Sequence, residues 1–248
     1  MSFVARRSVL VAAGLVALLI GMVASFPARV ALAWFAPPEL RAWGVSGTIW
    51  RGHAADLAFA QQALGRLSWD ARLGGLLTLR PTWDFDLRRP DGFAEARIAL
   101  SPDGKRQRIT NLEAAVDLAT LAPALLPNGV AGQLRISLQR LVIDNGWPMQ
   151  IAGRAAVAQL ELPGVIMPLG PFSFSFPDAA ESPAAEIVST GGPLAVDGQV
   201  DLPARGQWRF SAELAPGENP PPELVQGLVF VGEDLGGGRR RLVLSSEP

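Results

Sequence analysis

The chain has 248 residues, of which 49% are hydrophobic and 18% are charged, and its net charge is −1. This composition excludes a disordered chain, because it supplies ample apolar material for a core. It disfavours nucleic acid as a partner, because phosphate binders usually carry a basic excess. The absence of cysteine and the single histidine, His53, exclude disulfides and thiolate sites and disfavour a multi-histidine zinc site. We therefore expect no metal and no cofactor.

The first expected element is a membrane-spanning helix over residues 9–26, which form an uncharged apolar run. Eighteen helical residues reach about 27 Å, close to the thickness of the hydrocarbon core of a bilayer. Arg6 and Arg7 precede the run, so the tail of residues 1–8 is expected to stay in the cytoplasm while the rest of the chain crosses.

A cleaved signal peptide is the alternative to a retained anchor. Ala31-Leu32-Ala33 resembles a cleavage site, although the apolar run is longer than the ~7–15 residues of an ordinary signal peptide. Residues 27–43 are expected to lie at the membrane surface, with Trp34 and Phe35 at headgroup level. Pro37-Pro38 would end any helix there.

Small side chains recur every four residues along the expected membrane helix, at Ala13, Ala17, Gly21 and Ser25. This spacing places them on one stripe, which permits a close approach by another helix in lipid. A chance arrangement is the alternative, because these residue types are common in membrane segments.

Residues 44–248 are expected to form one mainly β domain with a curved, mostly antiparallel sheet, because apolar and polar residues alternate in many segments. Leu118–Leu126 is expected to be a short helix or turn, and 176–193 and 215–223 are expected to be surface loops. The clearest alternating segments are 82–88, 134–139, 172–176, 196–202 and 207–214.

The sequence offers little for catalysis. It lacks the nucleophile-elbow, metalloprotease, phosphate-loop and dinucleotide-binding motifs. Asp84 and Asp86 lie on one face of an expected strand and could act as paired carboxylates. Arg88 shares that face, however, so a solvated polar face explains all three residues. His53 lacks a neighbouring catalytic motif, so no catalytic residue is expected.

One segment points to a family. Gly47-Thr48-Ile49-Trp50-Arg51-Gly52 follows the expected anchor, and the chain resembles the protein N family of the bacterial type II secretion system. In that family a short cytoplasmic tail and one membrane helix precede a periplasmic domain that opens near a Gly-Thr-Leu-Trp-x-Gly motif. Gly47, Thr48, Trp50 and Gly52 match it, and Ile49 replaces the leucine. Residues 191–200 and 206–210 are also similar to the family.

The resemblance implies a non-enzymatic accessory protein of the inner-membrane platform, which supports export of folded proteins from the periplasm across the outer membrane. It implies a single-pass inner-membrane protein with most of its chain in the periplasm. The implied partners are other platform proteins and the outer-membrane secretin. Tethering at the membrane would raise effective concentration, so weak contacts would suffice.

A lipid binder is the alternative function. A sheet with an apolar inner face could hold a lipid chain, as in the AsmA-like and lipopolysaccharide-transport proteins, to which the strand pattern is also similar. The two functions differ in whether one apolar face runs uncovered across many strands. An enzyme is the third hypothesis, with Asp84, Asp86 and His53 as its testable residues.

Overall fold

The computed structural model describes residues 14–15, 17–60, 62–72, 74, 80–120, 129–163, 165, 167–178 and 183–246. The chain divides into two compact units, residues 1–71 and 72–248. The boundaries expected from the sequence after residues 8, 26 and 43 stay predictions.

The expected membrane segment is helical at residues 14–15 and 17–24, and its residues 9–13 and 16 lie outside the described part of the chain. None of the helices in the described part of the chain combines the length and apolar character needed to span a membrane. The retained anchor therefore stays a prediction.

The first unit joins a short helix to a small antiparallel sheet. Helix α2 (Ala28–Phe35) is followed by β1 (Leu40–Trp43), β2 (Ser46–Gly47), β3 (Arg51–Phe59) and β4 (Gln62–Arg72), whose last residue belongs to the second unit. Strand β3 pairs with β1, β2 and β4, always antiparallel. The buried side chains of this unit include Ala28, Ala54, Leu57 and Trp69, so small residues, one leucine and one indole ring contribute to its core.

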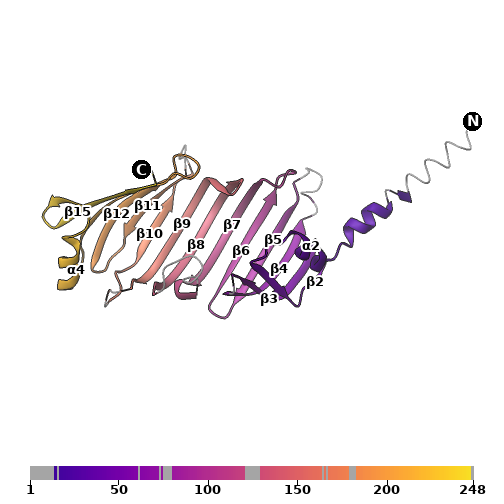
Figure 1. Ribbon diagram of the computed structural model, residues 1–248, viewed down its shortest axis with the longest axis horizontal. Coiled ribbons are helices and arrows are strands. Elements are labelled where there is room, and N and C mark those ends of the chain that lie inside the picture. The colour runs from indigo at the N-terminus through magenta and orange to yellow at the C-terminus, as the bar shows by residue number, and fades with distance from the viewer. Residues whose placement is uncertain are drawn as a thin grey trace, which may run out of the picture. The chain divides into compact units, whose positions relative to one another are not determined.

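The second unit is an antiparallel sheet whose neighbouring strands mostly follow one another along the chain (Figure 1). The strand order within this unit runs from β5 to β13 and then through β15 to β14, and no described pairing returns β14 to β5. The mainly β, antiparallel fold predicted from the alternation is therefore confirmed, and the sheet is open. Its strands are β5 (Thr82–Arg89), β6 (Gly92–Leu100), β7 (Arg106–Asp117), β8 (Ala131–Asp144), β9 (Trp147–Glu161), β10 (Phe172–Phe176), β11 (Ala184–Ser189), β12 (Leu194–Asp201), β13 (Arg209–Pro216), β14 (Glu233–Gly236) and β15 (Arg239–Ser245).

Tight turns explain why neighbouring strands pair. Asn145 and Gly146 join β8 to β9 with φ values of 48° and 78°, the paired positive values of a type I′ hairpin. Gly237 and Gly238 join β14 to β15 in the same way, with φ values of 64° and 79°. Such turns match the twist of the flanking strands and fix their register.

The loop predicted over residues 176–193 is wrong in part, because β11 lies inside it. Its Ile187 and Ala185 are buried; Ile187 pairs with both β10 and β12, and Ala185 pairs with β12. The surrounding proline and glycine residues mark the turns on both sides and hid this short strand. In the second predicted loop, α4 (Pro222–Leu228) begins close to its end. Residues 118–120 are helical, and 121–128 lie outside the described part.

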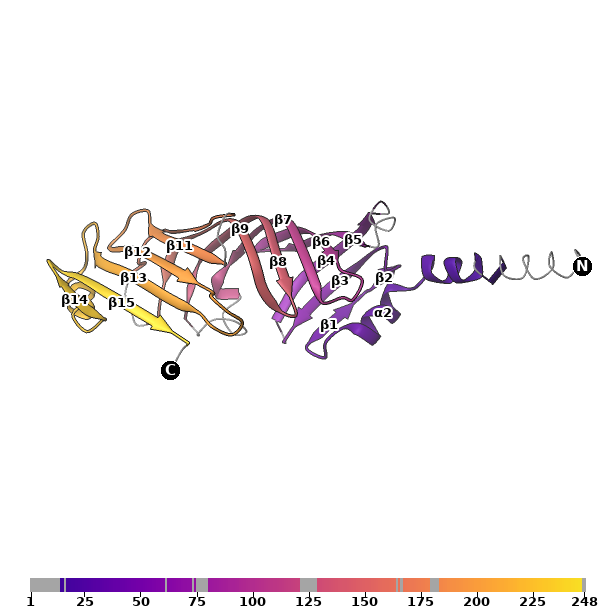
Figure 2. The same ribbon diagram turned by 90° about the horizontal axis from the view of Figure 1, so that it is seen from above.

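One face of the sheet carries an unbroken apolar line. The paired residues that cross the strands from β5 to β15 are all apolar or glycine along this line. The neighbouring line that starts at Asp86, here called the polar line, carries a polar residue on every strand from β5 to β13. The side-by-side order of β11, β12, β13 and β15 is seen in Figure 2. The apolar line consists of Leu87, Ala94, Ala114, Ile136, Ala155, Phe174, Ile187, Gly198, Ala212 and Leu242.

Burial along this face is uneven. A cluster of buried side chains spans β10 to β13 and includes the loop residue Leu169, and Leu224 of α4 packs against it. All residues of β6, in contrast, are only half-buried. The apolar face is thus a packed core near α4 and a partly exposed surface near β5 and β6.

Candidate functional sites

The family motif of residues 47–52, here called the junction motif, forms the tight turn between β2 and β3. The Thr48 amide donates to the Arg51 carbonyl at 2.8 Å. The Thr48 hydroxyl accepts from the Trp50 and Arg51 amides, each at 3.3 Å. The Trp69 indole, on β4, donates to the Thr48 carbonyl at 3.0 Å. One threonine therefore satisfies several polar groups of the turn, as hydroxyl residues commonly do.

The junction motif also binds the chain segment that leaves the N-terminal helix. The Trp50 indole N–H donates to the Val23 carbonyl at 2.8 Å, near the end of that helix. The Ile49 amide donates to the Phe26 carbonyl at 3.1 Å, and Pro27 and Thr48 form an isolated antiparallel bridge. These contacts attach the expected membrane segment to the start of the sheet.

The two glycines of the motif are required by close packing. Gly47 has a φ of 90°, and a Cβ there would overlap the Arg51 carbonyl oxygen. A Cβ at Gly52 would lie 2.5 Å from both the Ser46 carbonyl oxygen and the Trp69 ring. The structure thus gives Gly47, Thr48, Trp50 and Gly52 a shared role in shaping and attaching one corner. A functional role of these residues in secretion stays a prediction.

The residues considered for catalysis are held in other interactions. Asp84 binds the Arg72 Nε at 2.6 Å and the Arg97 Nε at 2.7 Å. Partial burial acts to raise the pKa of Asp84, but the hydrogen bonds from Arg97 and Arg72 outweigh it and lower the pKa. Asp86 pairs with Arg88 at 2.7 Å.

His53 is exposed, and its ring lies 3.2 Å from the Ser46 hydroxyl. Among the described residues, no group of three or more histidine, aspartate or glutamate side chains could hold a metal ion. His53 belongs to the first unit, and Asp84 and Asp86 to the second. The expectation of a non-enzymatic protein stays a prediction.

The small-residue stripe is only partly described. Ala17, Gly21 and Ser25 are exposed, and the Ser25 hydroxyl donates to the Gly21 carbonyl at 2.7 Å. Ala13 lies outside the described residues. Large apolar side chains of the same helix, including Leu18 and Ile20, are also exposed.

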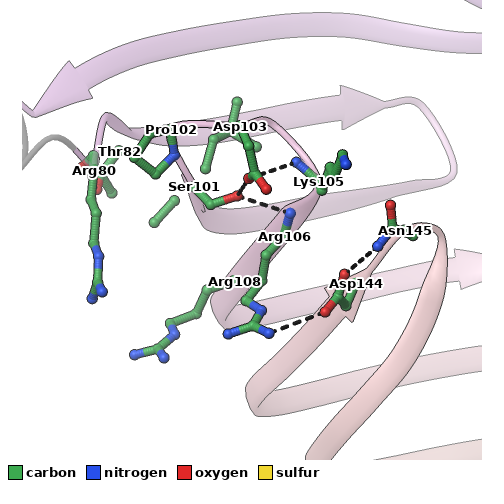
Figure 3. Close-up of a pocket in the computed structure, with 12 residues that line it drawn as sticks. Arg80, Thr82, Ser101, Pro102, Asp103, Lys105, Arg106, Arg108, Asp144 and Asn145 are labelled. Atoms are coloured by element: carbon green, nitrogen blue, oxygen red, sulfur yellow. Dashed lines mark hydrogen bonds and ion pairs between the residues drawn. The ribbon is translucent and has the colours of Figure 1, made fainter.

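A cavity of about 800 Å³ lies at one rim of the second unit, and we call it the rim cavity (Figure 3). Two turns build it, one between β6 and β7 and one between β8 and β9, and the Asn145 amide connects them by donating to the Lys105 carbonyl at 2.9 Å. Its lining residues are Arg80, Thr82, Ala99, Leu100, Ser101, Pro102, Asp103, Lys105, Arg106, Arg108, Asp144 and Asn145.

The turn between β6 and β7 is fixed by local hydrogen bonds. The Ser101 hydroxyl donates to the Asp103 carboxylate at 2.5 Å and accepts from the Arg106 amide at 2.9 Å. The Asp103 carboxylate also accepts from the Lys105 amide at 3.2 Å. The Ser101 and Lys105 hydrogen bonds lower the pKa of Asp103, so this carboxylate stays charged and holds the turn.

The sequence did not predict the rim cavity. The segment Lys105-Arg106-Gln107-Arg108 is a basic run in the sequence, and it is the signal from which a binding site for an anion could have been predicted. Arg80 lies before β5, far from this run in sequence, and only strand pairing brings it to the same cavity.

The junction motif and most of the sheet lie within a region that matches known proteins. A model of the family described as Type II secretion system (T2SS), protein N matches residues 38–243. The type II secretion system protein N of Aeromonas hydrophila is 29% identical over 216 residues, covering 82% of this chain and 83% of that protein. The protein of the same name from Vibrio cholerae serotype O1 is 30% identical over 161 residues, covering 62% and 64%. That of Pectobacterium carotovorum is 23% identical over 226 residues, covering 87% of each chain. No solved structure matches significantly.

Proposed function

Because the chain belongs to the type II secretion system protein N family, we propose that it is a non-enzymatic scaffold of the inner-membrane platform of that system. It supports the export of folded proteins from the periplasm across the outer membrane. The anchor of residues 9–26 holds it in the inner membrane, with residues 1–8 in the cytoplasm and the sheet in the periplasm. Its partners are other platform proteins and the outer-membrane secretin.

The junction motif is the observation that carries this proposal. A scaffold must transmit position from its anchor to its binding surfaces, and the Trp50–Val23 and Ile49–Phe26 hydrogen bonds connect the N-terminal helix to β3. A flexible linker would give no such coupling, because its ends move independently.

The test is purification of the tagged full-length chain from its native cell in mild detergent, followed by mass spectrometry of protein and lipid. If the chain is a scaffold, we expect secretion-system subunits to copurify with it at defined ratios. We also expect protein secretion to be lost when the gene is deleted. Normal secretion after deletion, together with the absence of copurifying subunits, would refute the proposal.

The small-residue stripe supplies a contact for that platform within the membrane. Ala17→Leu with Gly21→Leu places bulk on the stripe, which prevents close helix approach. Crosslinking to other inner-membrane proteins is expected to fall. Leu19→Trp, which adds bulk on the opposite side of the helix, serves as the control and leaves crosslinking unchanged. Equal crosslinking in both variants would remove the stripe from the proposal.

Lipid binding is the second candidate function, and the continuous apolar line across the sheet favours it. The line runs from Leu87 to Leu242 without a polar side chain. At β6 the apolar face is only half-buried. The occupant in this proposal is an acyl chain of a membrane lipid, whose apolar length matches a long uniform surface better than a compact ligand would.

Two adjacent residues with opposite orientations test this second function. Ile136 lies on the apolar line and Ser137 on the polar line. Ile136→Gln is expected to lower the amount of lipid that copurifies with the full-length chain, whereas Ser137→Gln leaves it unchanged. Circular dichroism confirms folding of both variants. If the wild-type chain carries no lipid, or both variants keep it, the acyl-chain proposal fails.

A further inference from the structure

The rim cavity carries more positive charge than its carboxylates neutralise. Four cations line it, at Arg80, Lys105, Arg106 and Arg108, against the two carboxylates of Asp103 and Asp144. The imbalance is local, because the whole chain has a net charge of −1.

The carboxylates of the cavity are already engaged. Asp144 binds Arg106 at 3.1 Å and Arg205 at 3.6 Å, and its second oxygen also accepts from the Asn145 amide group. The Asp103 carboxylate accepts hydrogen bonds from the Ser101 hydroxyl and the Lys105 backbone amide of its own turn. Arg205 thus brings a further cation to Asp144. The two carboxylates are therefore occupied and do not neutralise the remaining arginines.

Arg80 and Arg108 are the two lining arginines that this pairing leaves over. Within the part of the chain that the structure describes, neither guanidinium has a carboxylate within ion-pair distance. Both residues are exposed. Their side chains extend to the same side of the cavity, away from Asp103 (Figure 3). Two unpaired like charges aimed at one space repel each other, and an anion between them relieves that repulsion.

A second basic run, residues 239–241, differs because its side chains have partners within the protein. Arg240 donates to the carbonyls of Val229 and Val231, and Arg241 binds Glu213 at 3.0 Å. Those guanidiniums hold the end of the sheet together. The arginines near the C-terminus are thus paired internally, whereas Arg80 and Arg108 are left available to bind a ligand.

We infer that the rim cavity binds a phosphate group through Arg80 and Arg108. Each guanidinium offers a planar fork of N–H donors that matches phosphate oxygens. Two such forks offer more donors than the two oxygens of a single carboxylate accept, which favours phosphate. A volume of about 800 Å³, with Ala99, Leu100 and Pro102 in the lining, also admits the group to which the phosphate is attached.

The phosphate has two sources, a soluble phosphate compound or the headgroup of a lipid, and the experiment separates them. The full-length chain in an uncharged detergent is titrated at constant ionic strength with inorganic phosphate, with dihexanoyl phosphatidylglycerol and with dihexanoyl phosphatidylcholine, and binding is followed by calorimetry. Binding of inorganic phosphate indicates a soluble source. Binding of phosphatidylglycerol in preference to both other probes indicates a headgroup.

The test variant is Arg80→Gln with Arg108→Gln, and the matched control is Arg66→Gln with Arg135→Gln. The control removes the same charge from two exposed arginines that lack a described ion pair. Loss of both forks is expected to weaken binding at least about tenfold, and the control less than about twofold. Both variants keep their fold, because these exposed guanidiniums hold no other described group.

Three outcomes would overturn the inference. One is that none of the three probes binds. Another is equal weakening in the test and control variants, which indicates nonspecific attraction to net charge. The third is binding of a glutamate-rich peptide at the cavity without any binding of the phosphate probes, which assigns it to an acidic protein segment. The inference is independent of the scaffold role, because phosphate binding is measured on the purified chain and its outcome does not depend on whether secretion requires the protein.

Discussion

Asp84 shows how a residue that resembles a catalytic carboxylate is used structurally. Arg72 and Arg97 bind its two oxygens from different strands. Their hydrogen bonds outweigh partial burial and lower its pKa. The carboxylate therefore connects neighbouring chain segments on the polar face, where it keeps its charge at neutral pH.

The lowered pKa of Asp84 predicts a pH-dependent contribution to stability. A carboxylate whose folded pKa lies below its unfolded value of about 3.9 stabilises the fold above that value. The contribution disappears as the pH falls through the folded pKa. Urea unfolding of the wild type and Asp84→Asn between pH 7 and pH 2 measures it. The difference in unfolding free energy is expected to be full at pH 7 and to shrink below about pH 4. A difference that stays constant over this range would contradict the assignment.

Gly47 is expected to tolerate substitution less well than Gly104, another glycine with positive φ. Gly104 has a φ of 70° and open space where a Cβ would lie, whereas a Cβ at Gly47 overlaps the Arg51 carbonyl. Gly104→Ala is expected to cost about 1 kcal/mol from backbone strain alone. Gly47→Ala adds the overlap and is expected to cost about 3 kcal/mol. Urea midpoints measure both, and equal costs would mean that the turn relaxes easily.

At the scale of elements, each strand has one face that packs and one that is wet. Phe172 on β10 is buried in the cluster near α4, and the next residue, Ser173, points to the polar face. This alternation explains why strands were recognisable in the sequence. It also explains why β11 was missed, since its short run is bounded by residues typical of loops.

Phe172 and Ser173 together test the buried cluster. Phe172→Ala is expected to lower the unfolding free energy by about 3–5 kcal/mol, because it leaves a cavity among packed side chains. Ser173→Ala is expected to change it by less than about 0.5 kcal/mol. Chemical unfolding of both variants is the measurement. A small cost at Phe172 would indicate that α4 and the loop at Leu169 collapse into the space.

At the scale of the second unit, stability is expected to vary along the sheet. The buried cluster spans β10 to β13, while every residue of β6 is only half-buried. Regions with few buried apolar contacts open at lower free energy.

Hydrogen exchange of the full-length chain tests this gradient. Backbone amides in β10–β13 are expected to exchange more slowly than those in β5 and β6, although both regions have paired strands. Comparing amides hydrogen-bonded within ladders in each region controls for pairing itself. Uniform protection would mean that the second unit opens only as a whole.

The sequence by itself determined that the chain is mainly antiparallel β and that it resembles the protein N family. Both depend on local signals: alternation along strands such as 82–88, turn residues, and the ordered Gly47, Thr48, Trp50 and Gly52. Only tertiary structure decided what those residues do. The indole of Trp50 donates to the Val23 carbonyl, and Arg80 lines the same cavity as Arg108, because chain folding brings distant segments together. Sequence periodicity reports which face a residue occupies, but strand register determines which residues share that face across the sheet.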